Sequence, residues 1–252
     1  MIPGIDVSKW QGQIDWPKVA ADGYKFAIVK VSEGSWSDAC GARNVAAARA
    51  AGLAVGAYHY LRHDVPAWQQ AKTLAAESHG CLLLALDVER PGEERLAADL
   101  AEGVAARLRS LVPDARIVVY GSPSYLTNAG LISGTDSTIG ARVACPELAE
   151  ADLWIAWYRT DPPEQPPTYA GHRLLWDRWR IWQRTGTGSA AGIKGDVDLD
   201  LFDGDEGELK AFFAGLPEPQ GQPSVSSGLP IQPGEAIDPR QPRDPARAAH
   251  DT

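Results

Sequence analysis

The chain has 252 residues, of which 44% are hydrophobic and 23% are charged, so it is long enough for one large globular domain or two small ones. Its longest uninterrupted aliphatic run, residues 82–86, is far shorter than the roughly 18 apolar residues of a membrane-spanning helix. The net charge of -9 repels phosphate backbones and argues against nucleic acid as a partner. We therefore expect a soluble protein that neither inserts into membranes nor binds nucleic acid.

Short β-branched or apolar runs alternate with alanine-rich amphipathic stretches, which is the pattern of an α/β fold. Strands are expected at residues 4–8, 25–31, 54–60, 82–88 and 116–120, and helices at 15–21, 42–51, 66–78, 93–111 and 123–130. Three later strands, at 152–158, 180–184 and 196–202, bring the total to eight, and a closing helix is expected at 203–214. The connections between the later strands are rich in proline or glycine rather than helical. Some of the last strands are therefore expected to run antiparallel.

The composition of the chain changes after Phe213. Residues 216–252 hold 8 of the 19 prolines and none of the 20 aromatic residues, so this segment cannot bury a core. We predict one compact domain at residues 1–215, followed by a proline-rich linker or disordered tail at 216–252.

The cysteines and histidines do not form a recognisable metal site. The three cysteines are widely spaced and lack a C-x-x-C pair, which argues against both a zinc site and a disulfide framework. His59 and His63 are four residues apart, but on a strand and its loop that spacing does not place both on one face. We expect no metal and no cofactor. His59 is expected to have a supporting role, because Tyr58 and Tyr60 would point the other way.

Two carboxyl groups follow the apolar run at residues 82–86. Asp87 and Glu89 are two positions apart, and such positions on a strand face the same side. Their proximity in a partly dry pocket could raise the pKa of one of them for general-acid catalysis. Alternatively, Asp87 caps the next turn and Glu89 is solvated, and the D-x-E pattern alone favours this second interpretation.

Other strand ends also carry acids and aromatic residues, and their presence favours a catalytic role for Asp87 and Glu89 over the structural one. These residues are Asp6, Glu33, Tyr58, Tyr60, Tyr120, Trp157, Gln183 and Asp198. In a β/α barrel they would converge at the carboxyl-terminal face, where aromatic rings stack on sugars and carboxylates act on glycosidic bonds. Sugar contact is expected from Tyr58, Tyr60, Tyr120 and Trp157, and a core or wall position for Trp154, Trp176 and Trp182.

The sequence GIDVSKWQG at residues 4–12, followed by IDW at 14–16, resembles the opening of glycoside hydrolase family 25, the Chalaropsis-type lysozymes or N-acetylmuramidases. The resemblance continues in order through residues 26–34, 50–60, 86–89, 153–158, 181–183 and 197–200. The chain departs from the family pattern at three places, where a threonine, an aromatic residue and an asparagine are replaced by Ser32, Gly41 and Asp200.

The resemblance implies a TIM-like (β/α)5β3 barrel that hydrolyses the β-1,4 bond between N-acetylmuramic acid and N-acetylglucosamine in peptidoglycan, leading to bacterial cell lysis. By position, Glu89 resembles the family's proton donor and Asp87 its partner carboxylate. Asp6 and Asp198 resemble the two further acids. Glu33 and Gln183 are expected to join the aromatic residues in binding substrate. Direct attack by water and assistance from the substrate's acetamido group both remain open.

Two other functions remain as alternatives. An inactive carbohydrate-binding barrel would keep the aromatic residues and lose a key acid, whereas all four acids are present here. Another wall or chitin glycosidase would show a longer acid series than the single D-x-E. The expected partner is the glycan strand of peptidoglycan, bound by a monomer.

The chain begins without the basic and apolar regions of a signal peptide. Together with the proline-rich tail, this favours a phage endolysin that reaches the bacterial cell wall through a holin. Export by another route, or a trimmed bacterial autolysin, remains open.

Truncation at about Leu216 tests the domain boundary. Because residues beyond it contain no aromatic side chains, removing them should leave the melting temperature nearly unchanged, as measured by circular dichroism. A fall of more than a few degrees would show that the tail packs on the domain.

Overall fold

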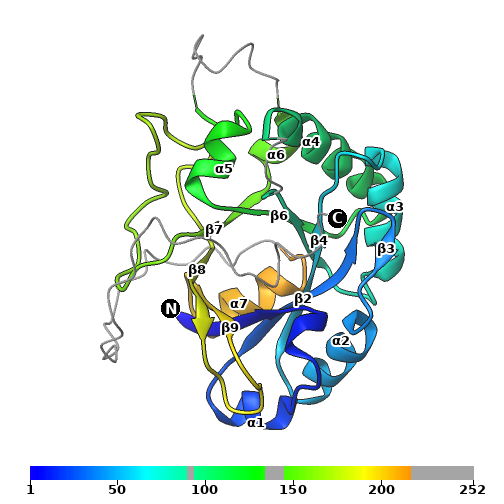
Figure 1. Ribbon diagram of the computed structural model, residues 1–252, viewed down its shortest axis with the longest axis vertical. Coiled ribbons are helices and arrows are strands. Elements are labelled where there is room, and N and C mark those ends of the chain that lie inside the picture. Colours follow the sequence, from blue (N-terminus) through cyan, green and yellow to red (C-terminus); the bar gives the residue numbers. More distant parts are fainter. Residues whose placement is uncertain (90–93, 134–144, 217–252) are drawn as a thin grey trace.

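Eight strands form a closed barrel in the computed structural model, which describes residues 1–89, 94–133 and 145–216 (Figure 1). Around the barrel the strands are β1 (Ile2–Val7), β2 (Phe26–Glu33), β4 (Ala54–Tyr60), β5 (Leu83–Asp87), β6 (Arg116–Gly121), β7 (Asp152–Ala156), β8 (Ile181–Gly188) and β9 (Val197–Phe202). The short strand β3 (Trp36–Ser37) folds back on the end of β2 as a hairpin.

Strand direction changes only at the closure of the barrel. Within the barrel, β1, β2 and β4 to β8 run parallel to one another, whereas β9 is antiparallel to both β8 and β1. The expectation that some late strands run antiparallel is confirmed for β9. The β7–β8 pair is parallel although residues 157–180 contain no helix, because this connection is long enough to return to the start of β8. The indole nitrogen of Trp176 anchors it by donating to the carbonyls of Leu148 and Ala151.

Helices cover the outside of the barrel after each of the first five strands. They are α1 (Trp16–Ala21), α2 (Gly41–Ala50), α3 (Ala67–Glu77), α4 (Glu94–Leu111), α5 (Pro123–Asn128) and α6 (Pro146–Ala149). Five β/α units followed by three strands give the predicted (β/α)5β3 arrangement. Three elements have no clear signal in the sequence: β3, α6 and the 3-10 turn η1 (Lys9–Gln11), each of which is four residues or shorter.

Side-chain alternation divides the core into two layers. On β5, Leu84 and Leu86 face the surrounding helices, whereas Leu83 and Ala85 point into the barrel. The strand is therefore apolar on both faces, which explains its continuous hydrophobic run.

The last helix, α7 (Glu206–Phe213), closes the amino-terminal end of the barrel. Phe213 packs against Phe26 at the start of β2, with ring centroids 5.3 Å apart. Phe212 packs at 5.2 Å against Phe202, the last residue of the antiparallel β9. Both contacts lie at the same end, so the opposite end, where the parallel strands finish, is left for polar residues.

The predicted tail, residues 216–252, lies outside the described residues apart from Leu216. Within the described part of the chain, no helix is both long enough and apolar enough to cross a lipid bilayer.

Candidate active site

Asp6 is held in one orientation by a hydrogen-bond network inside the barrel. It lies on β1 with 1% of its surface exposed, and Gln183 on β8 donates from Nε2 to its Oδ2 at 2.6 Å. The Oε1 of Gln183 accepts from the hydroxyls of Tyr120 and Tyr158, at 2.8 and 3.0 Å. Because two hydroxyl donors face the amide oxygen, the amide nitrogen is directed at the carboxylate of Asp6.

Strand β9 brings two more acids to the same face of the sheet. In the antiparallel register Asp198 lies opposite Asp6, and Asp200 lies opposite Gly4. The indole Nε1 of Trp154 donates to Asp200 Oδ1 at 2.8 Å. Complete burial raises the pKa of Asp200 well above its ordinary value, and the charge of Asp198 adds to this effect. Hydrogen bonds with Trp154 and Asp6 oppose the rise without cancelling it.

Asp87 and Glu89 lie at the carboxyl-terminal end of β5. In the sheet register, Asp87 has Tyr60 on one side and Tyr120 on the other. Asp87 is buried, whereas Glu89 is partly exposed. Glu89 is therefore the carboxyl group of this pair that is more accessible to an incoming molecule.

A β-bulge gives Glu33 two cationic partners. The pairing of β2 with β4 shifts between Lys30 and Ser32, and this extra residue lets Lys30 and Glu33, three positions apart, meet. Lys30 Nζ lies 2.7 Å from one carboxylate oxygen of Glu33, and Arg62 lies 3.2 Å from the other. Burial raises the pKa of Glu33, but the charges of Lys30 and Arg62 and their hydrogen bonds outweigh it, so the pKa is lowered overall. Glu33 is therefore an ion-paired carboxylate.

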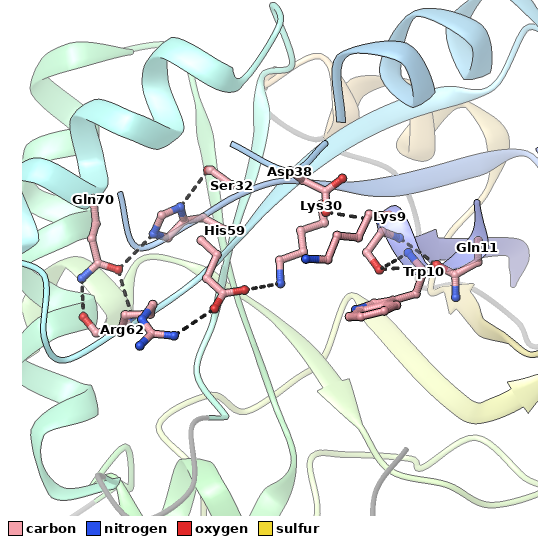
Figure 2. Close-up of polar contacts among 11 residues, drawn as sticks. Lys9, Trp10, Gln11, Lys30, Ser32, Asp38, His59, Arg62 and Gln70 are labelled. Carbon is pink, nitrogen blue, oxygen red and sulfur yellow. Dashed lines mark hydrogen bonds and ion pairs between the residues drawn. The ribbon is translucent and has the colours of Figure 1, made fainter. Parts of the chain in front are cut away.

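His59 lies on the other side of β4, between the barrel and α3 (Figure 2). Its Nδ1 is 2.8 Å from the hydroxyl of Ser32, and its Nε2 is 3.0 Å from Oε1 of Gln70 on α3. The same oxygen of Gln70 accepts from the backbone N–H of Arg62 at 3.0 Å. Ser32 and His59 are both fully buried, so this serine–histidine contact cannot reach a substrate. It supports the strand end and the loop that carry Glu33 and Arg62.

The predicted sugar-binding aromatic residues occupy different depths. Tyr58 and Tyr120 are buried and pack against Trp154, with ring centroids 6.2 and 4.4 Å away, so they form an aromatic layer inside the barrel. Tyr60 is partly exposed at the end of β4. Trp157 packs against the outer hydrophobic cluster rather than the inner one. The core positions predicted for Trp154, Trp176 and Trp182 are confirmed by their burial.

Several residues at this end of the barrel were not among the predicted site residues. Tyr158 follows Trp154 by four positions, and the period of two along β7 would have placed both on one face. Lys30 becomes a neighbour of Glu33 through the bulge, which has no clear sequence signal. Trp10 and Trp36 are 44% and 52% exposed, on the segments that follow β1 and β2.

The residues in the described ranges contain no group of three histidine, cysteine or acidic side chains placed to hold a metal ion. Among the acids described above, Asp6 accepts from the amide of Gln183, Asp200 from the indole of Trp154, and Glu33 is paired with Lys30 and Arg62. The arrangement can supply carboxyl groups for proton transfer and charge stabilisation, and aromatic and hydroxyl groups for binding a polar ring.

The order of these residues along the chain is that of a known family. The sequence profile of Glycosyl hydrolases family 25 matches residues 5–193, which include Asp6, Asp87, Glu89 and Gln183. The chain belongs to this family. It is therefore a glycoside hydrolase, as the resemblance predicted. Asp198 and Asp200 lie just beyond the matched span.

Relatives of this family 25 chain include enzymes and one uncharacterised protein. "Uncharacterized protein YegX" of Escherichia coli O157:H7 is 34% identical over 230 residues, which cover 86% of this chain and 75% of YegX. "Lysozyme M1" of Streptomyces globisporus is 28% identical over 229 residues, covering 84% of this chain and 71% of that protein. The crystal structure of the bacterial lysozyme from Streptomyces coelicolor matches with a TM-score of 0.70 and 27% identity, over 84% of this chain and 97% of that one.

Replacing His59 with glutamine tests the neutral state of this buried ring. Burial lowers the pKa of His59 to about 4, against about 6.5 for a histidine in an unfolded chain. The unfolded chain thus takes up a proton that the folded chain does not, and stability is lost as the pH falls between these values. In urea unfolding experiments, the unfolding constant of the parent should rise as the pH falls through this window, by up to about tenfold per pH unit. His59→Gln should lack this rise.

The partly exposed His172 provides the matched control, since His172→Gln makes the same substitution away from the buried contact of Ser32, His59 and Gln70. The interpretation is wrong if the ratio of the unfolding constants of parent and His59→Gln does not change with pH.

Proposed function

We propose that this glycoside hydrolase is a lysozyme, an N-acetylmuramidase that cleaves the β-1,4 bond between N-acetylmuramic acid and N-acetylglucosamine in peptidoglycan. The observation that supports the proposal is that three strands of the barrel carry acids at the same end. These acids are Asp6, Asp87, Glu89 and Asp198. Tyrosine hydroxyls and exposed aromatic rings at the same end suit a polar sugar chain, and two of the relatives described above carry the name lysozyme.

Glu89 is proposed as the general acid. It is the accessible member of the β5 pair, so its proton can reach the leaving oxygen of a glycosidic bond, whereas Asp87 is buried beside it. Asp87 would stabilise the positive charge that develops on the sugar ring during bond cleavage. Asp6 and Asp198, which face each other across β1 and β9, would complete the acidic end of the site.

Substrate binding is proposed at the residues around these acids. Tyr60 and Tyr158 are accessible and lie on either side of the acids, at the ends of β4 and β7. Tyr58 and Tyr120 would support them from the aromatic layer below. Gln183 would orient Asp6 through its hydrogen bond to that carboxylate. The ion-paired Glu33 would bind substrate at the rim of the barrel.

The proposed setting is the bacterial cell wall, with the glycan strand of peptidoglycan as the partner of a monomeric enzyme. The excess of acidic residues fits neither nucleic acid nor an anionic membrane as the main partner. Release through a phage holin or by another export route stays a prediction.

Replacement of Glu89 by glutamine should abolish hydrolysis of purified cell walls. Glutamine keeps the size of the side chain but cannot donate the proton, and loss of a positioned general acid typically lowers the rate by about 10² to 10⁴-fold. The circular dichroism spectrum should be unchanged. Glu206→Gln on the exposed side of α7 is the matched control. Activity of Glu89→Gln within about tenfold of the parent would contradict the assignment.

The bond that is cleaved can be read from the new sugar ends. Digested peptidoglycan is reduced with borohydride and hydrolysed with acid, and a muramidase should convert muramic acid to muramitol and leave glucosamine unreduced. Glucosaminitol would instead indicate a glucosaminidase or a related glycosidase. Wall binding without new reducing ends would indicate an inactive carbohydrate-binding barrel. Free peptide amino groups without any reduced sugar would overturn the carboxylate mechanism.

A further inference from the structure

A row of side chains leads from the acids of β5 to an exposed tryptophan on β3. In the sheet register Asp87 lies beside Tyr60, and Tyr60 beside Glu33. Glu33 in turn lies opposite Trp36 in the β2–β3 hairpin. Register partners on neighbouring strands present their side chains on the same face of a sheet. Because neighbouring strands are about 4.8 Å apart, the backbone of Trp36 lies roughly 14 Å along the sheet from that of Asp87.

The ring of Trp36 packs against the turn of its own hairpin and against Arg62. The turn has two residues, and the first of them, Gly34, has a φ of +52°. A Cβ atom at Gly34 would lie 2.8 Å from Cδ of Arg62 and 3.0 Å from the ring of Trp36, so a glycine here lets both side chains pack over the turn. The guanidinium carbon of Arg62 lies 5.0 Å from the centroid of the Trp36 ring. Arg62 therefore covers one face of the indole.

Arg62 is itself held in place by its neighbours. Its guanidinium donates to Glu33 at 3.2 Å and to the two carboxylate oxygens of Asp64 at 3.0 and 3.2 Å. Its backbone N–H donates to Oε1 of the buried Gln70 at 3.0 Å, and Gln70 Nε2 donates to its carbonyl at 2.7 Å (Figure 2). Trp36 therefore packs on a side chain that has little freedom to move.

The other part of the indole is open, because 52% of Trp36 is exposed. The two carboxylates that hold Arg62 are also accessible, since the side chains of Glu33 and Asp64 are 30% and 57% exposed. A purely apolar partner would remove water from these charged groups without replacing its hydrogen bonds, which is unfavourable. A sugar ring suits both features, because its C–H face can stack on an indole and its hydroxyls can donate to carboxylates.

We propose that Trp36 is the platform of a further sugar-binding site, which holds the glycan strand a few rings away from the bond that is cleaved. One sugar ring stacks on the open part of the indole and turns its hydroxyls toward Glu33 and Asp64. The strand then follows the row of side chains past Tyr60 to the acids of β5. Because the indole and Arg62 are already ordered, little conformational freedom is lost on binding. The identity of the ligand rests on the proposed function, whereas the ordered and exposed ring stands on the contacts alone.

Glycan strands of different length test the site. The probes are peptide-free strands, released from purified peptidoglycan by an amidase, and the disaccharide of N-acetylglucosamine and N-acetylmuramic acid. Binding is measured by isothermal titration calorimetry with Glu89→Gln as the reference chain, to limit cleavage. Adding Trp36→Ala should raise the dissociation constant of the long strands by about tenfold, because stacking on one ring is lost. The dissociation constant of the disaccharide should stay near that of the reference chain.

Two further variants of the reference chain show whether the effect belongs to this ring. Trp36→Phe keeps an aromatic face and should retain most of the affinity for long strands. Trp68→Ala is the matched control, since Trp68 on α3 is 57% exposed and lies outside the row of side chains. It should bind the long strands as tightly as the reference chain. The circular dichroism spectra of all these variants should be the same.

Four results would overturn the proposal. The first is unchanged binding of long strands by Trp36→Ala. The second is an equal loss for the disaccharide and the long strands, which would place the ring beside the cleaved bond. The third is an equal loss in Trp68→Ala, which would indicate unspecific adhesion of exposed indoles. The fourth is a loss seen only with strands that still carry their stem peptides, which would assign the ring to the peptide.

The further site and the proposed function can fail separately. A wild-type chain that releases no reducing ends from peptidoglycan would refute the proposed function. The titrations with Trp36→Ala would still decide whether this ring binds a glycan strand, because they measure binding and do not depend on cleavage.

Discussion

Closure of the barrel by the reversed strand β9 is the constraint on which the site depends. Seven parallel strands place their carboxyl-terminal ends at one rim, and β9 runs into the gap between β8 and β1 in the opposite direction. The acids of β9 therefore lie early in that strand, where they meet Asp6 and Gln183. Without this reversal, Asp198 would not lie opposite Asp6. Strand β8, which carries Gln183, would also not be joined to β1, which carries Asp6, through a shared neighbour.

The two ends of the barrel interior have opposite chemistry. Phenylalanines from α7, β2 and β9 fill one end, and burial of such side chains is worth about 1.5–3 kcal/mol each. Acids, amides and tyrosine hydroxyls fill the other end, where each polar group must find a partner or its desolvation is uncompensated. The apolar end thus supplies stability that allows the polar end to hold several acids close together at the strand ends.

Much of the fold and of the candidate site could be predicted from the sequence. The alternation of strands and helices predicted the (β/α)5β3 arrangement because each element has its own hydrophobic period, and the family resemblance pointed to the same fold. The acids were found because strand ends in such a barrel converge. The depth of Tyr58 and Tyr120 could not be predicted, since burial depends on which side chains lie above them. Trp157 and Tyr158 were harder still, because one residue of register exchanges the two faces of a strand.

The contacts that no local pattern reveals come from long-range pairing. Gln183 and Asp6 are 177 positions apart, and their hydrogen bond depends on the final closure of the barrel. Asp200 was noticed only as a departure from the family pattern, whereas its chemistry comes from neighbours on β1 and β7. The position of Arg62 likewise depends on Gln70, which orders its loop from α3.

The bulge in β2 makes the rim of the barrel tolerant of one change in chain length. Residues before Val31 keep one phase of alternation and residues after it keep the opposite phase. Deleting Val31 would restore an uninterrupted ladder in which Ser32 still pairs with His59 and Glu33 with Tyr60, so both side chains would keep their present faces. Lys30 and Glu33 would then be two positions apart on one face, as in a regular strand. A one-residue deletion here would thus leave the ionic rim in place and remove one buried valine from the outer hydrophobic cluster.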